Sequence, residues 1–116
     1  MAKKITLYPI GCDLKGAKNL RVAILKLSTS GILINSYEHP LVVNEQFHAT
    51  FELPGKNELI TIEAVVFKTY DQFKGKHGLV QPGHHVNELV FRNAPAAIRN
   101  QLAQYLAWVK ANAISS

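Results

Sequence analysis

The chain has 116 residues, of which 47% are hydrophobic and 18% are charged, and this composition indicates one globular domain, residues 1–116, rather than a disordered segment. The formal net charge of +5 admits an anionic partner, such as a nucleotide, a nucleic acid or an acidic protein surface, but selects none of them. No apolar run approaches the roughly 20 residues that cross a bilayer, so no membrane span is expected.

The first half of the chain is rich in strand-like residues. A first strand is predicted at 5–10, followed by a turn-rich stretch at 13–19. Residues 20–27 are apolar on both alternating faces, which is typical of a strand covered on both sides. After an interruption by Ser-Thr-Ser-Gly, the extended pattern resumes at 31–35.

The second half predicts a hairpin and a further strand. Residues 47–53 alternate cleanly between apolar and polar, and the turn signal Pro-Gly-Lys-Asn at 54–57 connects them to a β-branched strand at 59–68. Another strand is predicted at 86–91. The connection at 69–85 is long, and it forms either a hairpin extension or a mobile functional loop.

The pattern changes to helical spacing near the C-terminus. Asn93 is a suitable N-cap, Pro95 is tolerated in the first turn, and the predicted helix continues to about Ala111. One apolar stripe follows this helix: Ile98, Leu102, Tyr105, Leu106 and Val109. Several strands followed by one helix predict an α+β layout, with a bent antiparallel sheet or small barrel capped by the helix.

Catalytic and metal-binding patterns are absent from the sequence. It contains no Gly-x-Ser-x-Gly, His-Glu-x-x-His or Walker-type motif, so we do not expect an enzyme. The lone Cys12 excludes an internal disulfide and, with no signal peptide expected, favours a cytoplasmic location. No metal site is expected from the five histidines, which are His39, His48, His77, His84 and His85.

Nucleic-acid binding by a basic barrel needs exposed aromatic side chains between cations. Phe47 and Phe51 share the apolar strand face and are predicted to lie in the core. Only one segment has the required interleaving: Tyr70 and Phe73 among Lys68, Lys74 and Lys76. We therefore keep nucleic-acid binding as an alternative rather than as the expected function.

The segment 20–34, which reads Leu-Arg-Val-Ala-Ile-Leu-Lys-Leu-Ser-Thr-Ser-Gly-Ile-Leu-Ile, resembles the core of the PilZ domain family. In that family a strand ends in an [Asp/Asn]-x-Ser-x-x-Gly turn, and Lys26, Ser28 and Gly31 stand at the matching positions. The resemblance implies a mainly β (α+β) fold, a six-stranded antiparallel β-barrel with a C-terminal amphipathic helix. It also implies a relation to bacterial receptors for cyclic di-GMP.

The sequence departs twice from that family pattern. The family's Arg-x-x-x-Arg motif, whose guanidinium forks match guanine and phosphate groups, is missing. The only arginine before Ser28 is Arg21, and only Met1 to Lys4 precede the predicted first strand. Moreover, Lys26 replaces an oxygen acceptor by a cation. Ser28 and Gly31 are retained, but a turn favours both residues in any case.

These departures predict a degenerate member of the family in which cyclic di-GMP binding is weak or lost. We expect a non-enzymatic adaptor that acts through protein contact, using the 70–85 loop or the exposed side of the terminal helix. The alternative is a receptor of altered geometry, in which Lys26 and Arg21, with Lys3 or Lys4, meet the phosphates. The candidate nucleotide-site residues are Arg21, Lys26, Ser28, Ser30 and Gly31.

Overall fold

The computed structural model describes residues 8–70 and 83–112, with the backbone alone at 112. Six strands precede one helix within these residues. The elements are β1 (Ile10–Gly16), β2 (Asn19–Leu27), β3 (Gly31–Asn35), β4 (Gln46–Leu53), β5 (Glu58–Tyr70), β6 (Val86–Arg92) and α1 (Ala96–Asn112).

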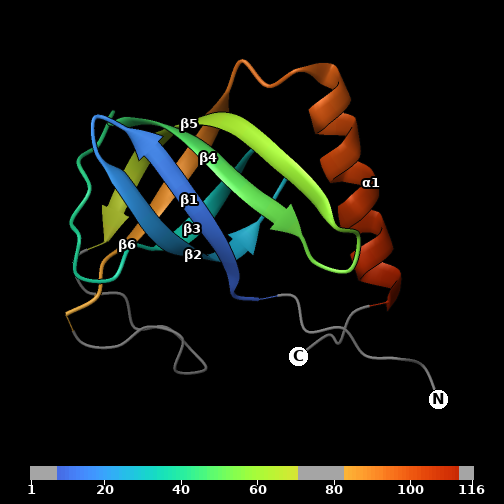
Figure 1. The fold of residues 1–116 in the computed structure, drawn as a ribbon, viewed down its shortest axis with the longest axis horizontal. Coiled ribbons are helices and arrows are strands. Elements are labelled where there is room, and N and C mark those ends of the chain that lie inside the picture. The colour runs from blue at the N-terminus through green and yellow to red at the C-terminus, as the bar shows by residue number, and fades with distance from the viewer. Residues whose placement is uncertain (1–7, 71–82, 113–116) are drawn as a thin grey trace.

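The strands form a closed antiparallel barrel in the order β1-β2-β3-β6-β5-β4, with β4 returning to pair with β1 (Figure 1). Closure leaves none of these six strands as a free edge. The predicted six-stranded antiparallel barrel with a C-terminal helix is confirmed. No helix within the described residues is long and apolar enough to cross a membrane.

The barrel interior is filled by side chains that alternate along each strand. In β4, Phe47, Ala49, Phe51 and Leu53 are all buried, with exposed fractions of at most 2%, while His48 and Glu52 face outward. This confirms the predicted one-sided strand and places both phenylalanines in the core. The predicted hairpin is also confirmed, because β4 pairs with β5 across the 54–57 turn.

The first strand lies later in the chain than the sequence predicts. β1 begins at Ile10, so Gly11 does not end the strand, and most of the predicted turn at 13–19 belongs to it. The predicted residues before Tyr8 lie outside the described part. Cys12 and Leu14 are fully buried inward positions, and pairing with both β2 and β4 outweighs the low strand propensity of the intervening Gly and Asp residues. Nine residues, rather than four, therefore precede β1.

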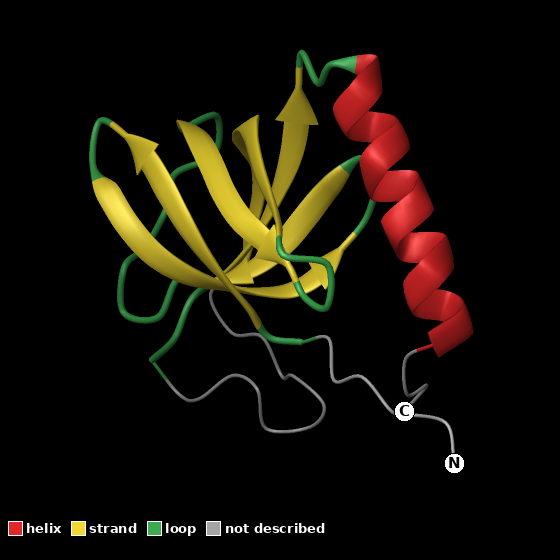
Figure 2. Ribbon diagram, turned by 45° about the vertical axis from the view of Figure 1, so that its right-hand side comes forward, coloured by secondary structure: helices red, strands yellow, loops and turns green. Residues whose placement is uncertain are grey.

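Helix α1 lies outside the barrel, along one side of it (Figure 2). Its predicted apolar stripe is confirmed, since Leu102, Tyr105 and Val109 are buried. The predicted cap is wrong: Asn93 has a φ of 53° in the link after β6, a left-handed conformation that Asn tolerates. The Arg99 N–H donates to the Pro95 carbonyl at 3.0 Å, so the helix begins at Ala96.

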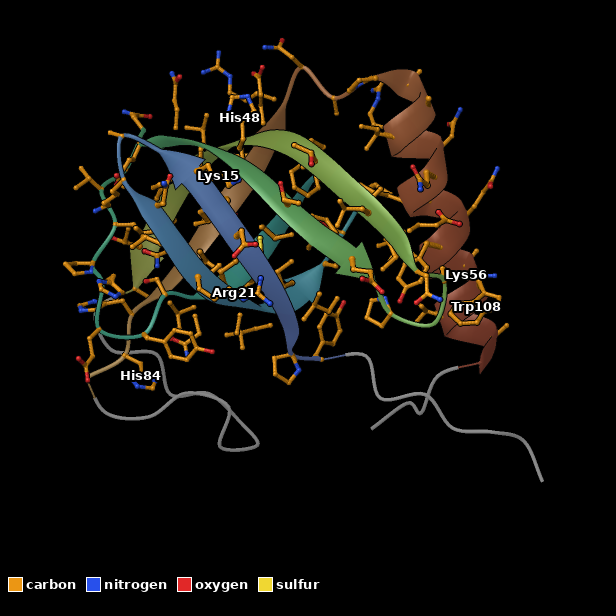
Figure 3. All side chains as sticks on the ribbon, viewed as in Figure 1. Lys15, Arg21, His48, Lys56, His84 and Trp108 are labelled. Carbon is orange, nitrogen blue, oxygen red and sulfur yellow. The ribbon has the colours of Figure 1, made fainter. Side chains whose placement is uncertain are left out.

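The C-terminal half of α1 packs on the turn between β4 and β5. The Tyr105 hydroxyl donates to the Pro54 carbonyl at 2.7 Å. The Lys56 ammonium lies 4.4 Å from the centre of the Trp108 ring, as the adjacent labels in Figure 3 illustrate. Gly55 has a φ of 84°, and a Cβ there would lie 2.9 Å from that ring, so glycine serves both the turn and the close approach.

Candidate functional site

The turn between β2 and β3 is closed by its own Ser28. The Ser28 N–H donates to the Gly31 carbonyl at 3.0 Å, and the Ser28 hydroxyl oxygen accepts the N–H groups of Gly31 at 3.1 Å and Ser30 at 3.3 Å. That hydroxyl also lies 3.1 Å from the Gly31 carbonyl and 3.2 Å from the Ser30 hydroxyl. Ser28 therefore organises the turn, and its hydrogen-bonding capacity is used within it.

Gly31 lets β3 approach β6 closely. A Cβ at Gly31 would collide with the Leu89 carbonyl oxygen, a backbone atom that cannot swing aside. The pairing partner of Gly31 is Val90, and the Phe91 N–H donates to the Ser30 carbonyl at 2.9 Å. The barrel itself thus requires glycine here, independently of any ligand.

Lys26 lies beside this turn with its side chain exposed. A bulge at Leu25 shifts the β2–β3 register, so that Lys26 pairs with Leu33. Lys26, Ser28, Ser30 and Gly31 line one shallow groove of about 240 Å³, together with Leu33, Glu88 and Val90. Within residues 8–70 and 83–112, Lys26 makes no ion pair. Four of the five predicted site residues therefore come together.

Arg21 lies outside this groove. Its guanidinium is 3.0 Å from the Asp13 carboxylate, which it faces across the β1–β2 pair, and it lies over Gly11, as its place beside β1 in Figure 3 shows. Arg21 and Lys26 are five residue steps apart along extended chain, about 16 Å at the usual strand rise. The backbone positions of these two cations are therefore much farther apart than the width of one phosphate group.

No pattern in the sequence points to Tyr8, which contacts the end of β2. The Leu27 N–H donates to the Tyr8 hydroxyl at 2.8 Å, next to the Ser28 turn. Burial raises the pKa of Tyr8 above its ordinary value, and the Leu27 backbone bond partly offsets this. A lone Tyr-Pro pair before a strand has no distinctive spacing, so only the folded chain reveals this contact.

Neither a reactive thiol nor a cluster of metal ligands is found among the described residues. Burial, with a smaller effect from the neighbouring Asp13, raises the pKa of the Cys12 thiol to about 12, so the nucleophilic thiolate is suppressed at neutral pH. Among residues 8–70 and 83–112, no three His, Cys, Asp or Glu side chains gather as metal ligands. His77 and the interleaved aromatic residue Phe73 lie outside those ranges, as does most of the predicted long loop.

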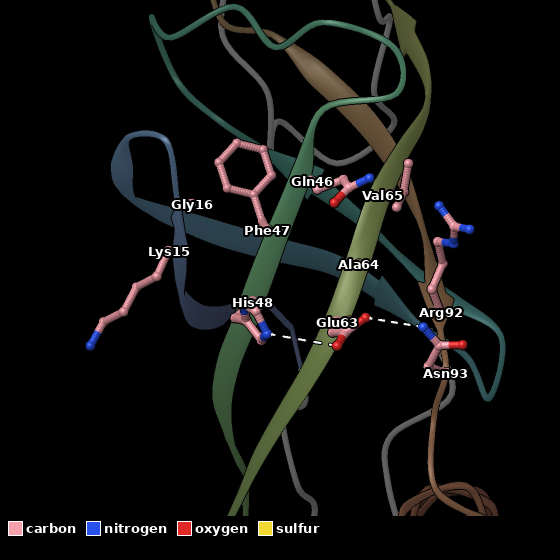
Figure 4. Close-up of a pocket in the computed structure, with 10 residues that line it drawn as sticks. All are labelled: Lys15, Gly16, Gln46, Phe47, His48, Glu63, Ala64, Val65, Arg92 and Asn93. Carbon is pink, nitrogen blue, oxygen red and sulfur yellow. Dashed lines mark hydrogen bonds and ion pairs between the residues drawn. The ribbon is translucent and has the colours of Figure 1, made fainter.

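A second pocket, of about 430 Å³, opens on the outer wall of the barrel (Figure 4). The strand registers align one row of side chains across four strands, in the order Lys15, His48, Glu63 and Arg92. The Glu63 carboxylate lies 3.9 Å from the His48 ring nitrogen and accepts a 3.3 Å hydrogen bond from the Asn93 amide. The row is therefore cationic at its ends, with its central carboxylate engaged.

A third space lies between the helix and the β2–β3 turn. This cleft, of about 880 Å³, has Thr29 and Ser30 on one side and Arg99, Asn100 and Ala103 of α1 on the other. It contrasts with the other half of the helix, which packs directly on the β4–β5 turn.

Comparisons with known proteins show which solved structures share this architecture. No family model and no curated protein matches the sequence. Among solved structures, the PilZ domain of YcgR from Escherichia coli with c-di-GMP is similar over 90% of this chain and 83% of that one, at 16% identity and a TM-score of 0.72. The chain has the PilZ fold.

Two longer proteins share this fold with the chain. The motility inhibitor MotI/DgrA of Bacillus subtilis aligns with 92% of this chain at 18% identity and a TM-score of 0.75. YcgR of Escherichia coli in complex with c-di-GMP aligns with 89% at 15% identity and a TM-score of 0.70. The chain spans 49% and 42% of these two structures, respectively.

Proposed function

We infer that this chain is a non-enzymatic bacterial PilZ-like signalling adaptor, which acts through protein contact and binds cyclic di-GMP weakly or not at all. The fold is shared with the PilZ domain of YcgR and with part of the motility inhibitor MotI/DgrA, which supports a role in motility or a related surface process. A cytoplasmic location, argued from the lone Cys12, is part of this proposal.

The observation that carries the proposal is the state of the β2–β3 turn. Its serine hydroxyl is occupied within the turn, and its glycine is required by the approach of Leu89. Lys26 brings a cation to the position where the family pattern has an oxygen acceptor, so it cannot accept a hydrogen bond there. Keeping the turn is therefore explained by the barrel, and ligand binding is not needed to explain it.

Isothermal calorimetry with cyclic di-GMP tests this proposal. We expect no saturable heat with tens of micromolar protein. The variant Lys26→Asn, which restores an oxygen acceptor, should remain silent because the arginine motif is still missing. Saturable binding at micromolar affinity or tighter, lost in Lys26→Ala and kept in the exposed control Lys110→Ala, would overturn the proposal.

One observation favours the alternative, a receptor of altered geometry. Lys26 is an exposed cation without an ion-pair partner in the described chain, and it lines a groove beside the turn. Such a cation suits a phosphate group. The alternative requires Arg21 to leave Asp13, so Asp13→Asn should tighten cyclic di-GMP binding if it is correct.

A further inference from the structure

The outer faces of β5 and β6 carry an exposed apolar patch, which we define as Val65, Phe67 and Val90. Val65 pairs directly with Val90, and Phe67 follows two residues later on β5. Phe67 is 60% exposed and Val90 is 36% exposed. The barrel core lies on the opposite face of these strands, so the patch contributes little to the packing of the interior.

Phe67 faces outward by the same alternation that places Val65 outside, and a β-bulge follows it. The β5–β6 register shifts between Val66 and Lys68, so Phe67 has no direct partner on β6. The inward positions of β5 end at Val66, which is fully buried, and then Phe67 and Lys68 are both exposed. Bulges commonly re-aim a side chain, and here Lys68, which alternation would turn inward, is exposed beside Phe67.

Leu59 provides a comparison on the same strand. It is 68% exposed, but its partner on β4 is Glu52, and its other neighbours along the outer face are polar. Single exposed apolar residues of this kind are ordinary on protein surfaces, whereas interaction surfaces are marked by large contiguous apolar patches. The grouping of Phe67 with Val65 and Val90 is what separates the patch from Leu59.

Cations predominate around the patch. Arg92 follows Val90 on the outer face of β6, and its cross-strand partner Glu63 is already engaged by His48 and Asn93. Within the described residues Arg92 makes no ion pair. Two further cations border the patch, Lys26 and Lys68, against one additional carboxylate, Glu88. An apolar centre with a polar, net positive rim complements an apolar segment that carries acids.

We propose that this patch docks an acidic amphipathic segment of a partner protein. The inference rests on the proposed protein-contact function and specifies its surface. An apolar side chain of the partner packs on Phe67, Val65 and Val90, and a carboxylate pairs with Arg92. Val90 and Arg92 are two residues apart on one strand, about 6.6 Å. This spacing matches an apolar and an acidic residue one helical turn apart, or two residues apart on a strand.

Site-specific photocross-linking in the cells that produce the protein tests this surface. A benzophenone side chain is placed at Phe67, at Leu59 or at Gln104, an exposed position on α1. Cross-linked segments are identified by mass spectrometry, and the captured protein is purified for affinity measurements. We expect capture from position 67 of a segment with an apolar and an acidic residue at the stated spacing.

Affinity for the purified captured protein supplies the second readout. Phe67→Ser should weaken the complex at least tenfold and Arg92→Gln several-fold, with the Arg92 effect fading at high salt. Leu59→Ser is the matched control and should change the affinity less than twofold. Circular dichroism checks that each variant keeps the barrel, as expected for substitutions at exposed positions.

The other outcomes overturn the inference in distinguishable ways. Capture from position 104 alone would contradict docking at the patch but leave the proposed protein-contact function standing. Capture of a basic segment, or of a second copy of this chain, would contradict an acidic partner segment. Equal capture from positions 67 and 59 would contradict docking at the patch. No capture from any of the three positions would count against the proposed function as well.

Discussion

The two turns that face helix α1 differ in how the helix meets them. The β4–β5 turn at 54–57 receives a hydrogen bond from Tyr105 and the ring of Trp108. The β2–β3 turn at 28–30 faces the same helix across a cleft of about 880 Å³. One turn is packed against the helix, whereas the other is held by its own hydrogen bonds and by its link to β6.

This difference separates two reasons for keeping a turn residue. Gly55 is needed because the helix covers its turn, and Gly31 is needed because two strands approach each other. Neither reason involves a ligand. A turn that resembles a family's binding motif can therefore persist for packing reasons after its binding partners are gone.

Removing the helix contact should have the largest effect. Leu102 is fully buried, and Leu102→Ala should lower the free energy of unfolding by about 3 kcal/mol through lost burial and a residual cavity. Urea denaturation followed by circular dichroism measures this loss. The adjacent control is Ala103→Ser, on the open side of the helix, with an expected change within about 0.5 kcal/mol. Equal losses at both positions would contradict the one-sided packing of α1.

Crowding the approach between β3 and β6 should come second. Gly31→Ala places a methyl group against the Leu89 carbonyl, and we expect a loss of about 2 kcal/mol in the free energy of unfolding. The same urea measurement applies. If the variant were as stable as the parent chain, the packing explanation for Gly31 would fail and a ligand-related reason would gain weight.

Removing the hydroxyl that closes the open turn should cost less. Ser28→Ala leaves the Gly31 N–H without its side-chain acceptor, so we expect a loss of about 1.5 kcal/mol. Thr29→Ala changes an exposed neighbour in the same turn and should stay within about 0.5 kcal/mol. Similar losses in the two variants would mean that the Ser28 hydroxyl does not organise the turn.

The smallest effect is expected at the covered turn. Tyr105→Phe removes the hydroxyl that bonds to the Pro54 carbonyl, at a cost of about 1 kcal/mol at neutral pH. Thermal or urea unfolding with the variant and the parent chain at pH 7 measures it.

The same substitution changes the alkaline pH dependence. Burial, followed by the proximity of Tyr8, raises the pKa of Tyr105 from its ordinary value of 10 to about 12. The unfolded chain therefore ionises first, and stability that is fully present below pH 10 falls as the pH rises from 10 to 12. Tyr105→Phe should make this fall shallower, as urea unfolding of the variant and the parent chain across this pH range measures.

Alternation and turn chemistry allowed most of the barrel to be predicted from the sequence. The 47–53 strand and its Pro-Gly turn carry strong local signals, and the helix has a clear apolar stripe. The start of β1 was missed because Gly11 and Asp13 look like turn residues, and strand pairing makes them extended, Gly11 with β2 and Asp13 with both β2 and β4. The N-cap was misplaced because Asn93 suits both a cap and a left-handed link.

The candidate site was predictable only in its local part. Residues 26–31 are close in sequence, so a motif brings them together. Arg21 belongs to the same strand, but its pairing with Asp13 depends on the β1–β2 register, which the misplaced first strand concealed. The patch around Phe67 depends on the pairing of β5 with β6, which brings Val90 beside Val65 and has no signature in the sequence.

The contact between Trp108 and the β4–β5 turn has an optical consequence. The chain has one tryptophan, and its indole lies 4.4 Å from the Lys56 ammonium and 5.7 Å from the Tyr105 ring. Tryptophan emission therefore reports the attachment of the helix to the hairpin, while far-ultraviolet circular dichroism is dominated by the barrel and helix backbone. Recording both signals during one denaturant titration shows whether the helix leaves before the barrel opens.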